Sequence, residues 1–238
     1  MQKNKKIALV SVVAIFLIIT TFLLLKSPIS QGQIEKSGKG IRGEFPVADF
    51  SQVESANDSE GRRAKNTFFD KTGHREIQEN DEVKIITQAE SWIEKLPAIP
   101  ISQSDIVLKG TVRDSHAYLS ANKTNVYSEF DVAVEKFIFT KEKPAPVIKN
   151  ISINREGGSV RFSSGHLQTY VLSGEGCPEN GKTYVLFLKR NDTFKGFLLL
   201  TAYEIADEKV YPVDNVASQL DYKEKTLTQF LNEIDKAM

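Results

Sequence analysis

The chain has 238 residues, in which 31 Lys and Arg balance 31 Asp and Glu. Basic and acidic residues are mixed along it, and no basic patch is interleaved with aromatic residues, which argues against nucleic acid as a partner. Cys177 is the only cysteine. An internal disulfide is therefore excluded, and the folded part must be stabilised by its core.

Residues 7–25 form an uncharged, almost entirely apolar stretch behind Lys3, Lys5 and Lys6. At a rise of about 1.5 Å per residue, one helix of this length spans the roughly 30 Å hydrocarbon core of a bilayer. The preceding lysines favour a cytoplasmic N-terminus. The sequence therefore predicts a single-pass signal anchor, or transmembrane helix, over residues 1–26. The rest of the chain is then expected outside the cytosol, in a periplasmic or extracellular space.

A cleaved signal peptide is the alternative interpretation of this stretch. Signal peptides have shorter apolar cores, of about 7–15 residues, followed by a small-x-small cleavage site. The best candidate site here is Pro28-Ile29-Ser30, which has proline where a small residue is needed. Both interpretations place the globular part outside the cytosol.

Residues 27–80 have a different composition from the anchor before them. Glycines are scattered among charged residues and serines, and no apolar period of 2 or 3.6 persists. Such a segment buries too little apolar surface to fold alone, so we expect a polar, flexible tether. Four phenylalanines could still dock on a folded domain: Phe45, Phe50, Phe68 and Phe69.

The globular domain is expected over residues 81–238, and it begins with a predicted helix at 81–96. Asp81 and Glu82 stand where the helix dipole favours negative charge, and Pro97 would end the helix. Apolar residues recur at helical spacing along it: Ile86, Ala89, Ile93 and Leu96.

From residue 106 the apolar pattern alternates with a period of two, which is typical of strands. Turn signals such as Gly157-Gly158 separate the runs. Residues 184–188 are apolar on both faces, as in a central strand. The predicted strands cover residues 106–113, 126–138, 147–153, 160–162, 167–172, 183–189, 196–201 and 209–213.

Seven or eight short strands with frequent turns predict a mainly β fold, either a small antiparallel barrel or a sandwich, with flanking helices. Long first strands and an unbroken central strand favour the barrel. Three phenylalanines are expected to face inward and fill it: Phe130, Phe187 and Phe197.

A last helix is predicted near the C-terminus. Thr226 and Gln229 fit a capping box at its start. Four residues form an apolar stripe along it: Leu227, Phe230, Leu231 and Ile234. This helix is expected to cover an end or an edge of the sheet.

Two pairs of segments carry a family resemblance: LPAIPISQSDIVLKGTV with KTNVYSEFDVAVEKF, and GGSVRFSSGHLQTYVLSGEG with GKTYVLFLKR. Together they resemble an uncharacterised family of exported, membrane-anchored bacterial proteins over roughly residues 92–213, a resemblance that implies no activity. More remotely, residues 105–112 and 181–188 are similar to strands of netrin-like modules, the OB-type barrels of tissue metalloprotease inhibitors. That similarity implies a barrel. It does not imply inhibitory activity, because those inhibitors need several disulfides and an N-terminal cysteine, and this chain has a single cysteine at position 177.

Candidate catalytic and metal-binding residues are few. His74, His116 and His166 lie far apart and without the ligand spacing of a zinc site. Asp114-Ser115-His116 holds the residue types of a serine hydrolase, but a triad is assembled from separate elements and Gly-x-Ser-x-Gly is absent. Cys177, before Pro178, is expected to be a turn or surface thiol. The sequence thus predicts no catalytic, cofactor-binding or metal-binding residue, and no cofactor.

Three functions remain open at this point. The favoured one is a non-catalytic binding or interaction module, held at the membrane, for an envelope protein, a peptide or a glycan. The second is a hydrolase whose site is assembled only in space, with four candidates: Ser115, Ser164, His116 and His166. The third is a carrier that holds a small ligand inside the barrel.

Overall fold

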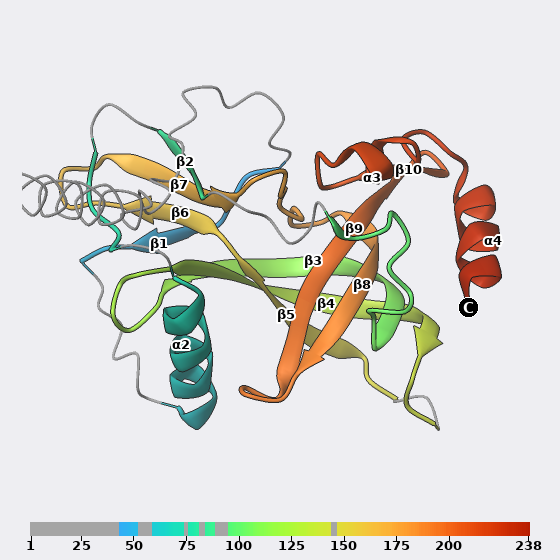
Figure 1. The fold of residues 1–238 in the computed structure, drawn as a ribbon, viewed down its shortest axis with the longest axis horizontal. Helices are drawn as coiled ribbons and strands as arrows, with labels where there is room; N and C mark the ends of the chain where they lie inside the picture. Colours follow the sequence, from blue (N-terminus) through green and yellow to red (C-terminus); the bar gives the residue numbers. More distant parts are fainter. Residues whose placement is uncertain (1–42, 52–58, 74–75, 81–83, 89–94, 144–146) are drawn as a thin grey trace, which may run out of the picture. The chain divides into compact units, whose positions relative to one another are not determined.

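The computed structural model describes residues 43–51, 59–73, 76–80, 84–88, 95–143 and 147–238 (Figure 1). The predicted anchor at 7–25 lies outside them, and among the described residues no helix has the length and apolar character needed to cross a bilayer. The elements, in chain order, are β1 (Val47–Asp49), α2 (Glu60–Thr72), β2 (Ile85–Gln88), β3 (Ile106–Leu119), β4 (Val126–Thr140), β5 (Asn150–Glu156), β6 (Gly158–Arg161), β7 (Leu167–Leu172), β8 (Thr183–Asn191), β9 (Gly196–Ala206), β10 (Lys209–Pro212), α3 (Ala217–Leu220) and α4 (Leu227–Ala237).

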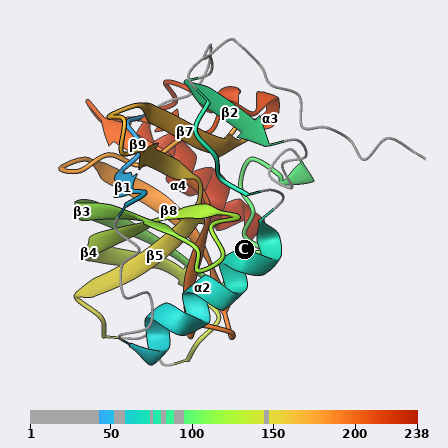
Figure 2. The same ribbon diagram turned by 90° about the vertical axis from the view of Figure 1, so that its left-hand side faces the viewer.

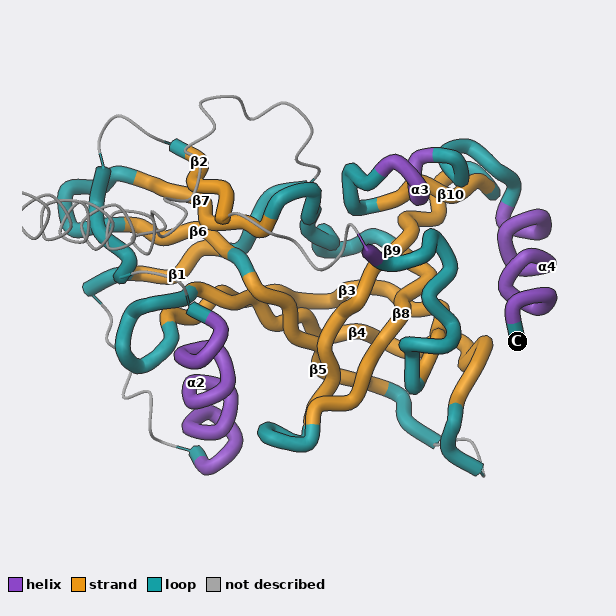
Figure 3. The backbone as a smooth tube through the Cα atoms, in the orientation of Figure 1, coloured by secondary structure: helices purple, strands orange, loops and turns teal. Residues whose placement is uncertain are grey.

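The larger sheet has six strands in the order β10-β9-β5-β4-β3-β8. Since β8 also pairs with β9, the strands β3, β4, β5, β9 and β8 close a ring of pairings (Figure 3). All neighbours in this sheet are antiparallel except β5 and β9, which pair in parallel at only two positions, Ile153 with Phe197 and Asn154 with Leu198. The mainly β prediction is confirmed, and every strand predicted from residue 106 onward corresponds to one in the structure.

The smaller sheet has four strands in the order β1-β6-β7-β2. The chain enters it directly from β5 through Gly157, whose φ of +100° is unfavourable for residues with a Cβ. A Cβ on Gly157 would lie 3.0 Å from the carbonyl oxygen of Tyr170. The predicted turn at Gly157-Gly158 is therefore a bend between two sheets and not a hairpin, because β6 pairs with β7 and not with β5.

Side chains from all five ring strands fill the space that the ring encloses. Phe130 and Leu186 are fully buried in this core, and Phe197 packs against it from a partly buried position. In β8 the alternate residues Val185 and Phe187 belong to a different cluster, on the outer side. The prediction that residues 184–188 form a central strand is thus confirmed, because β8 pairs with β3 and with β9. The inward orientation predicted for Phe187 is wrong, because its side chain packs in the outer cluster with residues of the C-terminal helix.

Helix α4 covers this outer cluster. Its N-terminal Thr226 and Gln229 form the predicted capping box, in which the Thr226 hydroxyl accepts from the Gln229 amide at 3.2 Å. Phe230 and Ile234 are fully buried, and the Phe230 ring lies 4.5 Å from that of Tyr203, measured between centroids. Burial of this stripe, more than helix propensity, stabilises so short a helix.

Residues expected to belong to the tether instead form β1 and α2, which corrects that prediction for the described residues between 43 and 80. Ser59 caps α2 by accepting from the Arg62 amide at 3.1 Å. Phe69 is 1% exposed, and its ring stacks on that of Tyr127 of β4 with 4.2 Å between the centroids. Figure 2 shows α2, in cyan, beside the strands of the larger sheet. The other phenylalanines of the segment also pack: Phe45 is buried in the ring core, Phe50 contacts Phe162, and Phe68 contacts Phe194.

The helix predicted at 81–96 is wrong at residues 85–88, which form strand β2. This strand pairs in parallel with β7, with Ile85 opposite Thr169. The segment Ile85-Ile86-Thr87 is β-branched throughout, and β-branched residues favour strands. Because β7 provides a free sheet edge, pairing of this segment with β7 outweighs the helical spacing of a few apolar residues. Residues 81–83 and 89–94 of the predicted helix lie outside the described part.

Candidate functional site

A cavity of about 360 Å³ lies among α2, β5 and β9, within the size range of small-molecule sites. The ladder between β5 and β9 ends at Asn154 and Leu198, and the residues that follow on each strand line the cavity. It therefore opens where two parallel strands separate. The lining residues are Phe68, Phe69, Lys71, Thr72, Asn154, Arg155, Glu156, Leu172, Glu175, Leu198 and Leu199.

Polar contacts with β4 hold α2 in place over this cavity. The Tyr127 hydroxyl donates to Asn66 Oδ1 at 2.9 Å and accepts from Arg62 Nη1 at 3.0 Å. Near the end of the helix, Asn125 Nδ2 donates to the Phe69 carbonyl at 3.3 Å. These contacts, with the stacking of Phe69 on Tyr127, position Phe68 and Phe69 as the apolar wall.

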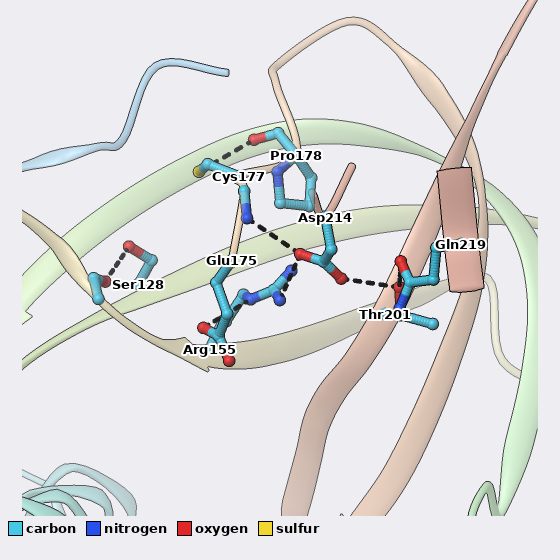
Figure 4. A network of polar contacts seen from close by, with 10 residues as sticks. Ser128, Arg155, Glu175, Cys177, Pro178, Thr201, Asp214 and Gln219 are labelled. Atoms are coloured by element: carbon cyan, nitrogen blue, oxygen red, sulfur yellow. Dashed lines mark hydrogen bonds and ion pairs between the residues drawn. The ribbon is translucent and has the colours of Figure 1, made fainter. Parts of the chain in front are cut away.

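Arg155 of β5 lies between two buried carboxylates (Figure 4). Its Nε donates to Glu175 Oε2 at 3.2 Å, and its Nη2 donates to Asp214 Oδ1 at 2.6 Å. The three side chains are at most 2% exposed. Glu175 follows β7 and Asp214 follows β10, so three separate parts of the chain meet in this triad.

Asp214 accepts further hydrogen bonds at both carboxylate oxygens. The Gly176 amide donates to Oδ1 at 2.9 Å, and the Thr201 hydroxyl donates to Oδ2 at 2.7 Å. Thr201 Oγ1 also lies 3.0 Å from the side-chain amide of Gln219. This network connects β9, the turn after β7 and helix α3, and it compensates the buried charge of Asp214.

The environment shifts the pKa values of Glu175 and Arg155. Burial raises the pKa of Glu175 to about 7, and the neighbouring Asp214 adds to this, although Arg155 opposes it. Burial lowers the pKa of Arg155, but the two carboxylates outweigh that effect and its pKa is raised, so it stays charged. The pKa of Glu175 thus lies close to neutral pH.

Two buried polar atoms of the cavity lining have no hydrogen-bond partner within the described part of the chain. They are Nη1 of Arg155 and Oδ1 of Asn154. Asn154 uses only its Nδ2, which donates to the Phe197 carbonyl at 3.2 Å. A buried unpaired group costs about 1–3 kcal/mol.

The hydrolase candidates do not form a nucleophile and base pair. Ser115 and His116 line a second cavity, of about 210 Å³, but they are neighbours on β3 and project to opposite sides of the strand. His116 Nε2 lies 3.1 Å from Asp114 Oδ2 in an exposed pair. The Ser164 hydroxyl donates to Glu79 and accepts from the backbone amide of His166, not from its ring.

The remaining candidates do not form a chemical site either. His74 lies outside the described residues, and within them no cluster of three or more His, Cys, Asp or Glu could bind a metal ion. Cys177 is 2% exposed, which corrects the expected surface thiol, and burial raises its pKa. A thiol whose pKa is raised is protonated at neutral pH and is a poor nucleophile.

Comparison of the chain with protein-family models and with curated protein sequences finds no match. The resemblances to an exported bacterial family and to netrin-like modules therefore stay predictions. The sequence pattern does not predict the cavity or the buried triad beside it. One signal was present: in β5, Arg155 occupies the inward-facing position that continues Ile151 and Ile153, where a charged side chain requires buried partners.

The raised pKa of Glu175 predicts a pH-dependent stability. Because the folded state binds this proton more tightly than the unfolded chain, the resulting stabilisation is complete below about pH 4.5 and is lost as the pH rises through about 7. We expect Glu175→Gln to remove a decrease of on the order of 2–3 kcal/mol in the free energy of unfolding between about pH 5 and pH 8. Urea unfolding of both proteins at the two pH values measures this difference.

The matched control is Glu142→Gln, which changes an exposed carboxylate of the surface pair with Arg190. It should leave the pH dependence of the wild-type chain unchanged. An equal pH dependence in the wild-type chain and in Glu175→Gln would contradict the assignment of this proton to Glu175.

Proposed function

We propose that the chain is a non-catalytic binding module whose ligand is a small molecule, or a short segment of a larger one, held in the cavity among α2, β5 and β9. The observation that carries the proposal is that this cavity of about 360 Å³ is lined by two buried side chains with unpaired polar atoms, Arg155 and Asn154. Buried polar groups in folded proteins are nearly always paired. Unpaired atoms in residues that line a cavity therefore support a partner that binds there.

We further propose that the five ring strands form a small barrel of the OB type. Numbered along the chain as first to fifth, β3, β4, β5, β8 and β9 pair in the order first, second, third, fifth, fourth and back to first. Barrels of this type bind ligands on their surface, at strands and loops. Because side chains fill the space inside the ring, the ligand of this proposal lies beside the barrel and not within it.

The location that we propose is the one the N-terminal sequence indicates. The apolar stretch at 7–25 and the lysines before it support a membrane anchor with a cytoplasmic N-terminus and the binding module outside the cytosol. Among the partners expected there, the cavity size favours a small ligand or the end of a peptide or glycan over a large flat protein surface. Release from vesicles by alkaline carbonate would contradict the anchor.

Methyl NMR of the leucine-labelled full chain tests the proposed site with hexan-1-ol as a neutral probe. We expect saturable shifts of the Leu172 and Leu199 methyl groups, which line the cavity, and none at Leu167 and Leu220, which are 42% and 41% exposed elsewhere. Leu198→Trp should fill the cavity from a half-buried position and reduce the affinity by about tenfold or more, since the probe loses its apolar contacts.

The matched control is Leu167→Trp, which adds the same side chain at the exposed first position of β7 and should not affect the affinity for hexan-1-ol. Equal shifts at the cavity leucines and at Leu167 would contradict a specific site. Equal affinities of the two tryptophan variants would place the binding elsewhere.

A further inference from the structure

Building on that proposed function, we infer that the cavity selects a ligand whose polar end is a positively charged amine joined to an apolar chain. The residue that would receive the amine is Glu175, which lies in the turn after β7 and lines the cavity. The inference depends on the unpaired oxygen of this carboxylate, on the charges around it and on the apolar part of the lining.

The carboxylate of Glu175 has one oxygen in a hydrogen bond and one without a partner. Its Oε2 accepts from Arg155 Nε at 3.2 Å (Figure 4), and no other residue in the described part of the chain donates to the carboxylate. The side chain is only 2% exposed, so bulk water hydrates it poorly. Since Glu175 lines the cavity, a ligand held there is the partner that its Oε1 can meet.

The charges around Glu175 favour a cationic donor over a neutral one. Arg155 contacts both Glu175 and Asp214, at 3.2 Å and 2.6 Å, so the three ionised side chains carry one net negative charge. Glu156, also on the lining, lies close enough to raise the pKa of Glu175 further. Lys71 of α2 is a cation of the lining, but it is exposed and water screens it. A ligand amine would therefore compensate an excess of negative charge, whereas a ligand carboxylate would add to it.

The type of hydrogen bond also favours an amine. An ammonium group carries donors only, which matches a carboxylate oxygen that can only accept. A hydrogen bond between an ammonium and a carboxylate is about twice as strong as one between neutral groups. This gain offsets part of the cost of removing the amine from water.

The apolar part of the lining determines the rest of the ligand. Two aromatic rings of α2 and three leucines line the same cavity: Phe68, Phe69, Leu172, Leu198 and Leu199. Contact with these side chains would remove apolar ligand surface from water. A volume of about 360 Å³ accommodates a chain of several carbons together with its amine.

Proton binding at Glu175 makes this selection dependent on pH. Burial raises the pKa of Glu175 to about 7, so its ionised fraction rises from about one tenth at pH 6 to about nine tenths at pH 8. Protonated Glu175 leaves the triad with Arg155 and Asp214 neutral, and only ionised Glu175 gives it a negative charge. An alkylammonium stays charged over this range, because its pKa is near that of lysine, about 10.4. We therefore expect the affinity for a cationic ligand to rise about fivefold to tenfold from pH 6 to pH 8.

Three probes with one six-carbon chain test the inference: hexylammonium, hexan-1-ol and hexanoate. Each is titrated into the leucine-labelled full chain at pH 6 and at pH 8, and the shifts of the Leu172, Leu198 and Leu199 methyl groups give the affinity. At pH 8 we expect hexylammonium to bind at least about tenfold more tightly than hexanoate and about fivefold more tightly than hexan-1-ol. Of the three affinities, only that for hexylammonium should rise from pH 6 to pH 8.

Glu175→Gln removes the negative charge at similar size. It should weaken hexylammonium at pH 8 at least about tenfold, and by more than it weakens hexan-1-ol. It should also abolish the pH dependence of hexylammonium binding. The matched control is Glu142→Gln, which changes an exposed carboxylate paired with Arg190 and should leave all three affinities within about twofold.

If hexan-1-ol or hexanoate binds at pH 8 as tightly as hexylammonium, the inference is overturned while the proposed binding site stands. The same holds if Glu175→Gln keeps the pH dependence of hexylammonium binding. If none of the three probes shifts the cavity methyl groups, the proposed function falls and the inference falls with it. Should Glu175→Gln not fold, the ranking of the probes and their pH dependence on the wild-type chain still decide.

Discussion

Asp214→Ala is expected to lower the free energy of unfolding by about 3–5 kcal/mol, because it leaves a buried arginine without one of its two charge partners. Arg155 Nη2 donates to Asp214 at 2.6 Å, and neither side chain is more than 2% exposed. The substitution also removes the acceptor of the Gly176 amide and of the Thr201 hydroxyl. Urea unfolding of the full chain, followed by circular dichroism and tyrosine fluorescence, measures the change.

The control for this prediction is Glu142→Ala, which breaks the surface ion pair with Arg190, where both side chains are at least 43% exposed. Pairs of this kind contribute about 0–1 kcal/mol, because water and salt screen them. An equal loss in the free energy of unfolding in the two variants would show that water screens the Arg155 triad. The unpaired Nη1 of Arg155 would then not destabilise the folded chain.

Phe230→Ala is expected to cost about 3–5 kcal/mol, which is the usual effect of truncating a fully buried phenylalanine. Its ring is 0% exposed and lies 4.5 Å from the ring of Tyr203 and 5.6 Å from that of Tyr222, measured between centroids. Truncation leaves a void between α4 and the outer face of β8 and β9. Thermal and urea unfolding measure the loss.

Thr228→Ala on the exposed face of the same helix is the control, and it should change stability by no more than about 0.5 kcal/mol. If Phe230→Ala were as mild as this control, α4 would not be an integral part of the folded unit. A loss of helical signal without a loss of global stability would lead to the same conclusion.

Local pattern was sufficient for much of this fold. Alternation of apolar residues identified the strands from residue 106 onward, because a strand with one buried face must alternate. The capping box at Thr226 and Gln229 marked the start of α4, since both its hydrogen bonds are made within one turn. In each case the residues that determine the element are the residues that form it.

Local pattern failed where partners are distant. Helix α2 carries few apolar residues and docks through polar contacts such as Asn66 with Tyr127, 61 positions apart. Strand β2 depends on the edge of β7, which lies far along the chain. Phe187 was assigned to the wrong face because both faces of β8 are buried, so alternation cannot distinguish inside from outside.

By itself, the amino-acid sequence determined a mainly β fold, its strand segments and its final helix, because these follow from periodicity and capping over a few residues. Only the tertiary structure decided which strands close the ring, that α2 packs on β4, and that Arg155 meets Glu175 and Asp214 beside a cavity. The two carboxylates follow Arg155 by 20 and 59 positions, and no local rule relates residues so far apart. The buried charge requires partners, but only the folded chain determines which residues supply them.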